Sequence, residues 1–291
     1  MANYFAKAHV FYIFTVTNCH VGSGSTASEE IDLPFQRDSL GYPTIYASSL
    51  KGSIKSFLLR TYEDSKKGDV FYLFGKDESA DEASKVSILD AVLLLIPARI
   101  ISVSNGFSGV YAYVTTVELL DTAKSYLDAV SSLTQGNLDK KNDEVKFYKA
   151  DENGNLEVIV NESYFKFKEN DDLKTTIPVI PPSVNKPIFV FEGNIGKDII
   201  NRSLIRVRRI RIDRGKKTVE IGGLWSEEYV PHNTYFMSVT LEREDGKKDG
   251  GSQSTLELFN SIKNKLNYLV IGGHETIGKG IVRGRTFIDV S

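Results

Sequence analysis

The pattern of apolar and polar positions predicts a chain built largely from strands. Residues 8–17 alternate aromatic and β-branched side chains, which predicts a strand. Residues 87–99 form an almost continuous apolar run ended by Pro97, which predicts a buried central strand or a pair of strands. Within that run, Asp90 is more typical of a hydrogen-bonded structural group than of a catalyst. Further strands are predicted at residues 109–117, 234–241, 268–271 and 281–290.

Helical periodicity marks three other segments. From residue 48, apolar side chains recur at i, i+4, i+7 and i+8, which predicts a helix that Ser48 or Ser49 caps. Residues 119–133 predict a second helix, and a capping box at Ser254 and Glu257 predicts the start of a third. The third helix should bury one apolar stripe: Leu258, Ile262 and Leu266.

A basic hairpin is the most unusual predicted element. Residues 206–224 predict two strands around a turn at 213–216, with a bulge at Arg208 and Arg209. Their alternating arginines and β-branched side chains offer no apolar face wide enough to stand alone in water. Residues 202–217 hold eight basic side chains against one acid. The hairpin is either a sheet edge protected by charge or a projecting arm on a nucleic-acid backbone, and the number of basic side chains favours the arm.

The remaining segments predict how the parts of the chain are joined. Residues 135–172 shift toward charged and amide side chains around a turn at 151–155, which predicts a surface insertion. Four prolines between residues 178 and 187 favour an extended connector between two halves of one architecture. We therefore expect residues 1–291 to form a single α+β domain, because the repeated strand–helix order suits ferredoxin-like units.

Charge and cysteine content exclude several classes of protein. The 291 residues carry a net charge of −2, which argues against a general polyanion binder, although the cationic cluster predicts a local phosphate-binding surface. The single cysteine, Cys19, excludes an internal disulfide and a cysteine-rich zinc site, and we expect a buried thiol there. The sequence shows no signal-peptide pattern and no apolar run of membrane-spanning length, so we expect a cytoplasmic protein without a membrane partner.

Three polar segments in close succession predict a site. Residues 18–24, 31–38 and 46–52 are too rich in Gly, Ser and Pro to form regular core elements. Lys51 and Lys55 follow near a helix N-terminus, where free N–H groups favour a phosphate. A solvated lysine pair is an equally good interpretation of these two residues.

Two later motifs add candidate chemistry. In residues 272–283, glycines between two predicted strands let backbone N–H groups approach a phosphate, and Lys279 and Arg283 add charge. The spacing matches neither a P-loop nor a dinucleotide-binding unit, since a strand follows the glycines. Glu227 and Glu228 predict either an acid/base or metal role, or ion pairs with the neighbouring arginines, which we favour slightly.

Taken together, these motifs resemble the RAMP superfamily of CRISPR proteins. The resemblance rests on His20-Val21-Gly22-Ser23-Gly24, Ser48-Ser49-Leu50-Lys51-Gly52 and the glycine-rich loop with the following Arg283. More narrowly, four further motifs resemble the backbone nuclease subunits of type III-B (Cmr) effector complexes. They are IDLPFQR at 31–37, LFG at 73–75, the hairpin through RID at 211–213, and GLWSEEYVP at 223–231. These motifs span nearly the whole chain.

The resemblance implies a ferredoxin-like (RRM-like) palm with inserted elements and a projecting basic hairpin. Several copies would stack as a helical filament along a guide RNA, beside other Cmr subunits, and cleave single-stranded target RNA paired with that guide. The family's catalytic-loop aspartate falls on Asp32, which would hold Mg²⁺ or Mn²⁺, and its loop histidine falls on His20. Its acidic–aromatic pair falls on Glu227 or Glu228 with Tyr229. The expected RNA-contacting residues are Lys51, Lys55, Arg37, Arg206, Arg208, Arg209, Arg211, Lys279 and Arg283.

General chemistry agrees with this implication. The 2′-OH of RNA can attack its own phosphate once the bond is in line and charge on the phosphoryl oxygens is offset, so no protein nucleophile is needed. One carboxylate holding a hydrated divalent ion suffices, and His20 can move the proton. Without the resemblance, Asp32 is more typical of a turn carboxylate that caps the next segment. A non-catalytic RNA-binding subunit and a metal-independent guide-processing endoribonuclease of the same superfamily remain as alternatives.

Overall fold

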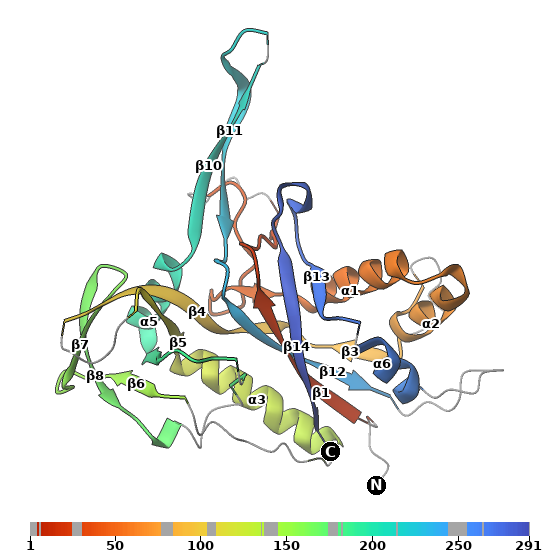
Figure 1. The fold of residues 1–291 in the computed structure, drawn as a ribbon, viewed down its shortest axis with the longest axis horizontal. Coiled ribbons are helices and arrows are strands. Elements are labelled where there is room, and N and C mark those ends of the chain that lie inside the picture. The colour runs from red at the N-terminus through yellow and green to blue at the C-terminus, as the bar shows by residue number, and fades with distance from the viewer. Residues whose placement is uncertain are drawn as a thin grey trace.

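The chain has a mixed α/β fold in which one large sheet carries a long hairpin that points away from the body (Figure 1). The structure is a computed structural model. It describes residues 5, 7–24, 31–76, 84–103, 109–134, 136, 145–173, 180–181, 183–213, 215–243, 255–263 and 265–290. Of the predicted features, Ser254 and the prolines at 178 and 182 lie outside these residues.

Four long strands form the first part of the sheet, in the order β14-β1-β12-β4 with antiparallel neighbours. They are β1 (Lys7–Thr15), β4 (Ala91–Ser102), β12 (Tyr235–Glu242) and β14 (Ile281–Val290). Short strands flank them: β2 (Thr44–Ile45), β3 (Val86–Ile88) and β13 (Tyr268–Val270). All the strands predicted in these regions are confirmed, including the pair at residues 87–99.

Helices cover both faces of this part of the sheet. Alternate side chains of β1 divide between two cores: Phe11 and Ile13 pack with α1 (Ala47–Thr61), α2 (Asp64–Phe74) and α6 (Thr255–Lys263). Val10 and Tyr12 pack with α3 (Val117–Thr134). Burial on both faces explains why β1 is apolar at nearly every position. None of the helices in the described ranges is long and apolar enough to cross a membrane.

The start of α1 differs from its prediction. Its N-cap residue is Tyr46, which makes no side-chain capping bond, so neither Ser48 nor Ser49 caps the helix. Instead, the Ala47 N–H donates to the Asp90 carboxylate at 2.6 Å. The aspartate between β3 and β4 is therefore a structural hydrogen-bonding group, as the sequence favoured, and it satisfies an N–H that the helix itself leaves unpaired.

The second part of the sheet closes on itself. The strands β4, β5 (Tyr111–Thr116), β9 (Ile188–Phe191), β6 (Phe147–Ala150), β8 (Ser163–Glu169) and β7 (Leu156–Val160) pair in that order, and β7 pairs back to β4. Phe167, Phe189 and Phe191 fill this six-stranded ring.

The strands within residues 135–172 belong to the large sheet and do not form the surface insertion that the sequence predicted. That segment supplies β6, β7 and β8, half of the ring, and buries Phe147, Val158 and Phe167 in the core. The turn predicted at residues 151–155 is confirmed, with the Gly154 N–H donating to the Asp151 carbonyl.

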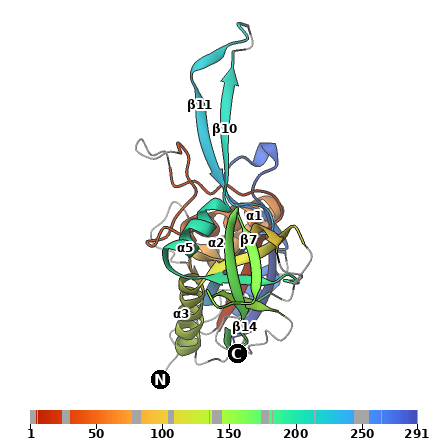
Figure 2. The same cartoon turned by 90° about the vertical axis from the view of Figure 1, so that its left-hand side faces the viewer.

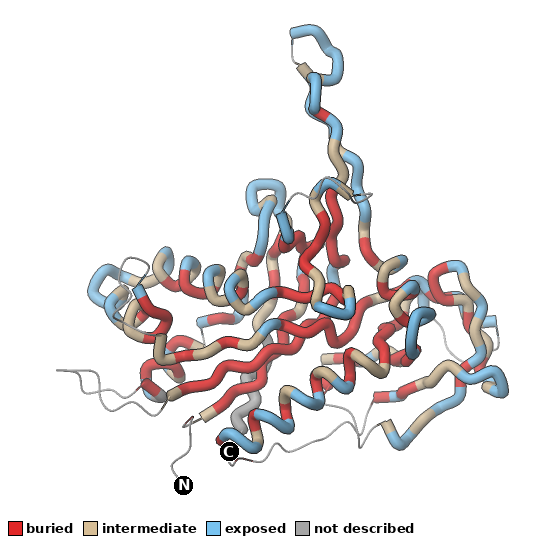
Figure 3. The backbone as a smooth tube through the Cα atoms, turned by 180° about the vertical axis from the view of Figure 1, so that it is seen from behind, coloured by how far each residue is buried: buried red, intermediate tan, exposed pale blue. Residues whose placement is uncertain are grey.

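The hairpin consists of β10 (Ile205–Ile212) and β11 (Val219–Tyr229), which pair with each other in a separate two-stranded sheet. It follows α5 (Gly193–Arg202), so Arg202 is helical. Figure 2 shows it standing away from the body, and Figure 3 shows that its outer part is largely exposed. The bulge is not at Arg208 and Arg209 but between Ile210 and Ile212.

Candidate active site at the base of the hairpin

The base of the hairpin has two chemically distinct faces. It includes Ser226 to Tyr229, because β11 continues to Tyr229, beyond its predicted end. Directly paired residues share a face of a two-stranded sheet. The Asp32 face, as we call it, carries Arg206 opposite Glu228 and Arg208 opposite Ser226. The Glu227 face carries Arg209 opposite Trp225, followed by Glu227 and Tyr229. The adjacent residues Glu227 and Glu228 therefore point to opposite sides.

Asp32 is held at the edge of β11 by Ser226. The Leu33 N–H donates to the Ser226 carbonyl at 3.0 Å, which aligns the loop beside the strand. The Asp32 Oδ2 accepts hydrogen bonds from the Ser226 N–H at 2.7 Å and from its hydroxyl at 2.8 Å. These bonds, the hydroxyl bond first, hold the pKa of Asp32 below its usual value, although the side chain is exposed. Asp32 is therefore an ionised and accessible carboxylate.

The donor set at Asp32 fits a hydrated Mg²⁺ or Mn²⁺. Both Ser226 bonds go to Oδ2. Among the described residues, none donates a side-chain hydrogen bond to the second oxygen, Oδ1. Within the ranges the structure describes, no group of three or more His, Cys, Asp or Glu side chains is arranged to hold a metal ion. A cation at Asp32 would therefore keep most of its waters, as Mg²⁺ commonly does when one carboxylate and phosphate oxygens bind it.

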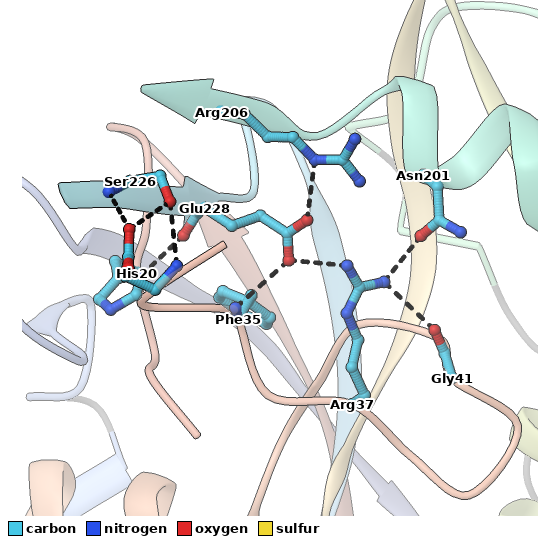
Figure 4. A network of polar contacts seen from close by, with 9 residues as sticks. His20, Phe35, Arg37, Gly41, Asn201, Arg206, Ser226 and Glu228 are labelled. Carbon is cyan, nitrogen blue, oxygen red and sulfur yellow. Dashed lines mark hydrogen bonds and ion pairs between the residues drawn. The ribbon is translucent and has the colours of Figure 1, made fainter. Parts of the chain in front are cut away.

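Glu228, on the Asp32 face, is neutralised by two arginines. Its side chain is 1% exposed and pairs with Arg37 at 2.7 Å and with Arg206 at 3.4 Å (Figure 4). Arg37 also donates to the Gly41 carbonyl and to Asn201. These contacts tie the Asp32 loop to β11 and α5. The Glu228 carboxylate is thus buried and neutralised, whereas Arg37, 26% exposed, stays a predicted RNA contact that also has a structural partner.

Glu227 is the centre of a hydrogen-bond cluster on the opposite face. Its carboxylate is 0% exposed and accepts from Trp225 Nε1 at 2.6 Å, from Arg209 at 3.2 Å and from the Tyr229 hydroxyl. Burial alone would raise the pKa of Glu227, but hydrogen bonds from Tyr229, Trp225 and Arg209 hold it below its usual range. Burial and then Glu227 raise the pKa of Tyr229 to about 12.

These contacts show which of the two acids is paired with Tyr229. Glu227, not Glu228, is the carboxylate that pairs with Tyr229. Its buried oxygens have protein donors, so we expect Glu227 and Tyr229 to position the hairpin rather than to exchange protons with RNA. The interpretation as ion pairs, slightly favoured from the sequence, describes both acids.

His20 bonds to the backbone of β11 and packs beside Tyr229. Its ring is 6% exposed, and Nδ1 is 2.7 Å from the Glu228 carbonyl, which favours the tautomer with the proton on Nδ1. The ring packs against Tyr229 and His274, with centroid distances of 5.4 and 5.3 Å. A Cβ at Gly22 would lie 3.0 Å from Nε2, so the glycine leaves that nitrogen open. His20 is a narrowly accessible proton acceptor.

The glycine-rich loop serves packing rather than a phosphate cradle. A Cβ at Gly272 would lie 2.0 Å from the His20 carbonyl, and one at Gly280 would lie 2.2 Å from the Ile271 carbonyl. The Gly273 N–H donates to the His20 carbonyl. Gly272 and Gly280 have positive φ and let the loop press against the segment around His20. The prediction that their N–H groups bind phosphate is therefore not supported.

The predicted cations of this region differ in accessibility. Lys279 lies 5.5 Å from the Tyr229 ring centroid and Arg283 lies 5.7 Å from that of Tyr268, both partly exposed. Lys51 is partly exposed, and burial and then Lys55 lower its pKa. Lys55 is 8% exposed and lies 5.6 Å from the Phe71 ring centroid, so α2 leaves little of it open to an RNA.

Two residues of this site were not predicted. Ser226 orients Asp32, and His274 Nε2 lies 3.4 Å from Glu227 Oε1, which links the glycine-rich loop to the hairpin. Both contacts join segments far apart in the chain. The only sequence signal was that each residue lies inside a motif, and a motif does not indicate which side chain its members touch.

The chain belongs to the RAMP superfamily, whose sequence model matches residues 12–283, and within it to the family of the Cmr4 subunits of CRISPR systems. It is 43% identical to "CRISPR system CMR subunit Cmr4" of Saccharolobus solfataricus, with 98% of each chain covered. It is 31% identical to "CRISPR system Cmr endoribonuclease Cmr4" of Pyrococcus furiosus, with 95% of each chain covered.

A solved structure agrees with this relationship. The fold matches a chain in the cryo-EM structure of the type III-B Cmr-beta complex bound to cognate target RNA, with a TM-score of 0.84 and 45% identity. The match covers 98% of each chain. The mixed α/β fold described above is therefore that of a RAMP protein, as the motifs indicated.

Proposed function

We propose that this chain is a backbone subunit of a type III-B CRISPR effector complex, which binds guide RNA and cleaves the target RNA paired with it in the cytoplasm. Similarity along the whole chain to Cmr4 proteins supports the assembly and the RNA partners. The observation that carries the nuclease activity is Asp32, because it alone of the three candidate carboxylates is exposed and has no cationic partner among the described residues.

A ferredoxin-like palm is the finer fold that we propose. The order β14-β1-β12-β4, with α1 between β1 and β4 and α6 between β12 and β14, has the strand and helix sequence of such a unit. The six-stranded ring and the hairpin are then additions to this palm. Copies of the chain would stack along the guide RNA, beside other Cmr subunits, so that each copy presents one hairpin and one Asp32 to the target.

The cleavage that we propose is transesterification. The 2′-oxygen of the target forms a bond to the adjacent phosphorus while the bond to the 5′-oxygen breaks, and the 5′-oxygen takes up a proton. A divalent ion bound at Asp32 would offset charge on the phosphoryl oxygens. Ser226 orients Asp32 for this task, and His20, with Nδ1 on the Glu228 carbonyl, keeps Nε2 for the proton of the 2′-OH.

The test is cleavage of a guide-paired target by the purified complex. We expect several cuts at regular intervals, dependence on Mg²⁺ or Mn²⁺, and fragments ending in a 2′,3′-cyclic phosphate. A target with 2′-deoxy at each cleaved nucleotide should resist cutting, whereas 2′-deoxy at a neighbouring nucleotide should not protect it. Cleavage of the first deoxy target would exclude transesterification, and target capture without any cutting would favour a non-catalytic backbone subunit.

A further inference from the structure

Arg208 is the exception among the described hairpin arginines. Arg206 pairs with Glu228, Arg209 with Glu227, and Arg211 with Glu220. Arg208 is exposed and has no ion-pair partner among the residues that the structure describes. An unpaired guanidinium on a rigid strand is available for a phosphate, which it can bind through two parallel hydrogen bonds.

The strand register brings Arg208 to the Asp32 face. Arg208 is paired directly with Ser226, so the two Cβ atoms lie on one face about 5 Å apart. Ser226 in turn donates its hydroxyl to Asp32 at 2.8 Å. Because β10 lies on one side of β11 and the Asp32 loop lies on the other, Ser226 separates the arginine from the aspartate.

The backbones that carry these two charges lie on opposite sides of β11. Neighbouring strands lie about 4.8 Å apart, so two strand spacings separate the backbones that carry Arg208 and Asp32. Ser226 is the smallest side chain on its face of β11, between Leu224 and Glu228. The structure records no ion pair between Arg208 and Asp32, although both side chains are exposed and close in register. An arginine and a carboxylate left apart across a serine can take a phosphate and its bound cation between them.

We propose that Arg208 is a further catalytic residue, which binds the scissile phosphate of the guide-paired target above Ser226 and opposite Asp32. This inference rests on the nuclease function proposed above. The attacking and leaving oxygens change as described there, while the guanidinium adds positive charge at the phosphoryl oxygens as negative charge grows on them. Arg208 therefore contributes more to the transition state than to target binding.

The experiment measures single-turnover cleavage at saturating target by complexes rebuilt with variant copies. For Arg208→Ala we expect a cleavage rate constant about 100-fold lower, with target affinity reduced far less. Arg208→Lys should recover part of that rate, because the lysine ammonium keeps the positive charge but cannot form the two parallel hydrogen bonds of a guanidinium. The matched control is Arg99→Ala. It removes an exposed arginine of β4 that pairs with Glu162, and it should leave the cleavage rate unchanged.

A phosphorothioate at the scissile phosphate gives a second readout. The rate ratio between oxygen and sulfur substrates should shrink in Arg208→Ala, since the contact that senses the substitution is gone. An unchanged single-turnover rate, with only weaker binding and a lower salt dependence, would overturn the inference and leave Arg208 as a backbone contact. The proposed nuclease function has its own test in the same assay. It is contradicted if complexes with Asp32→Ala cut the target as fast as the wild-type complex.

Discussion

The two faces of the hairpin base use the same kinds of side chain for opposite purposes. On the Glu227 face, a carboxylate is buried and surrounded by donors from the hairpin and the glycine-rich loop. On the Asp32 face, a carboxylate is exposed and held by a serine, and the arginine across the strand has no ion-pair partner within the described part of the chain. The difference shows that an acid beside arginines is not by itself a catalytic signal.

Partner geometry, rather than residue type, separates the two roles. A carboxylate whose oxygens accept from Trp, Tyr and Arg side chains cannot also hold a hydrated cation without losing those bonds. The Glu227 carboxylate is therefore held within the hairpin base, whereas the Asp32 carboxylate stays accessible. We therefore expect variants of the two acids to have different effects, on cleavage for Asp32 and on stability for Glu227.

The largest effect is expected from Asp32→Ala. Target cleavage by the reconstituted complex should fall about 1,000-fold, because the carboxylate that would hold the cation is gone. Guide binding and target capture should persist, since the exposed side chain contributes little to the core. The matched control is Asp64→Ala, an exposed acid paired with Lys67 at the start of α2. His20→Ala should slow cleavage less, because water can accept the proton. Wild-type cutting by Asp32→Ala would return the chain to a structural role.

A smaller effect, of a different kind, is expected from Glu227→Ala. Removing the acceptor leaves Arg209, Trp225 and Tyr229 without the carboxylate that they bond to. The free energy of unfolding should fall by about 2 kcal/mol, less than for a fully buried ion pair because Arg209 is partly exposed. Thermal denaturation of the isolated chain measures this loss. Glu220→Ala, which removes a half-exposed acid paired with Arg211, is the control and should change the melting temperature little.

Glu227→Gln then distinguishes positioning from acid/base catalysis. An amide keeps an acceptor oxygen for the donors of the cluster, so this variant should retain most of the cleavage rate of the wild-type complex. An acid/base role requires a titrating group, and glutamine would then be as damaging as alanine. Equal losses in the two variants would contradict the positioning role.

The sequence predicted best the long strands that read as continuous or alternating apolar runs. The final strand was predicted with its observed bounds, Ile281–Val290, and β1 and β4 were recognised because they are packed on both faces. The strands β6, β7 and β8 were missed as part of the sheet. They are short, partly exposed and rich in lysine and glutamate, and their place is set by pairing with β4 and β9 far along the chain.

For the site, the motifs pointed to segments that the structure brings together, but not to the contacts within them. Asp32 and the hairpin arginines were named through motifs, whereas periodicity alone did not show that α2 lies against Lys55. The glycine-rich loop was assigned to a phosphate because glycine permits any close approach. The group that approaches is the His20 carbonyl, 2.0 Å from where a Gly272 Cβ would lie. Such long-range contacts leave no local trace in the sequence.

The smallest effect is expected from Ser226→Ala, which sharpens the account of the Asp32 face. The hydroxyl bond is the main cause that lowers the pKa of Asp32 from 3.8, so its loss should raise that pKa toward 3.8. Because the folded-state pKa is the depressed one, the bond stabilises the folded protein above the unfolded pKa, and this stabilisation is lost as the pH falls through the folded pKa. Carboxyl NMR titration of the isolated chain should show the rise. Between pH 6 and 8, where Asp32 is ionised in both proteins, cleavage should be slower by about two- to fivefold with an unchanged pH profile. An Asp32 titration that does not move in the variant would show that the Ser226 hydroxyl does not hold the carboxylate.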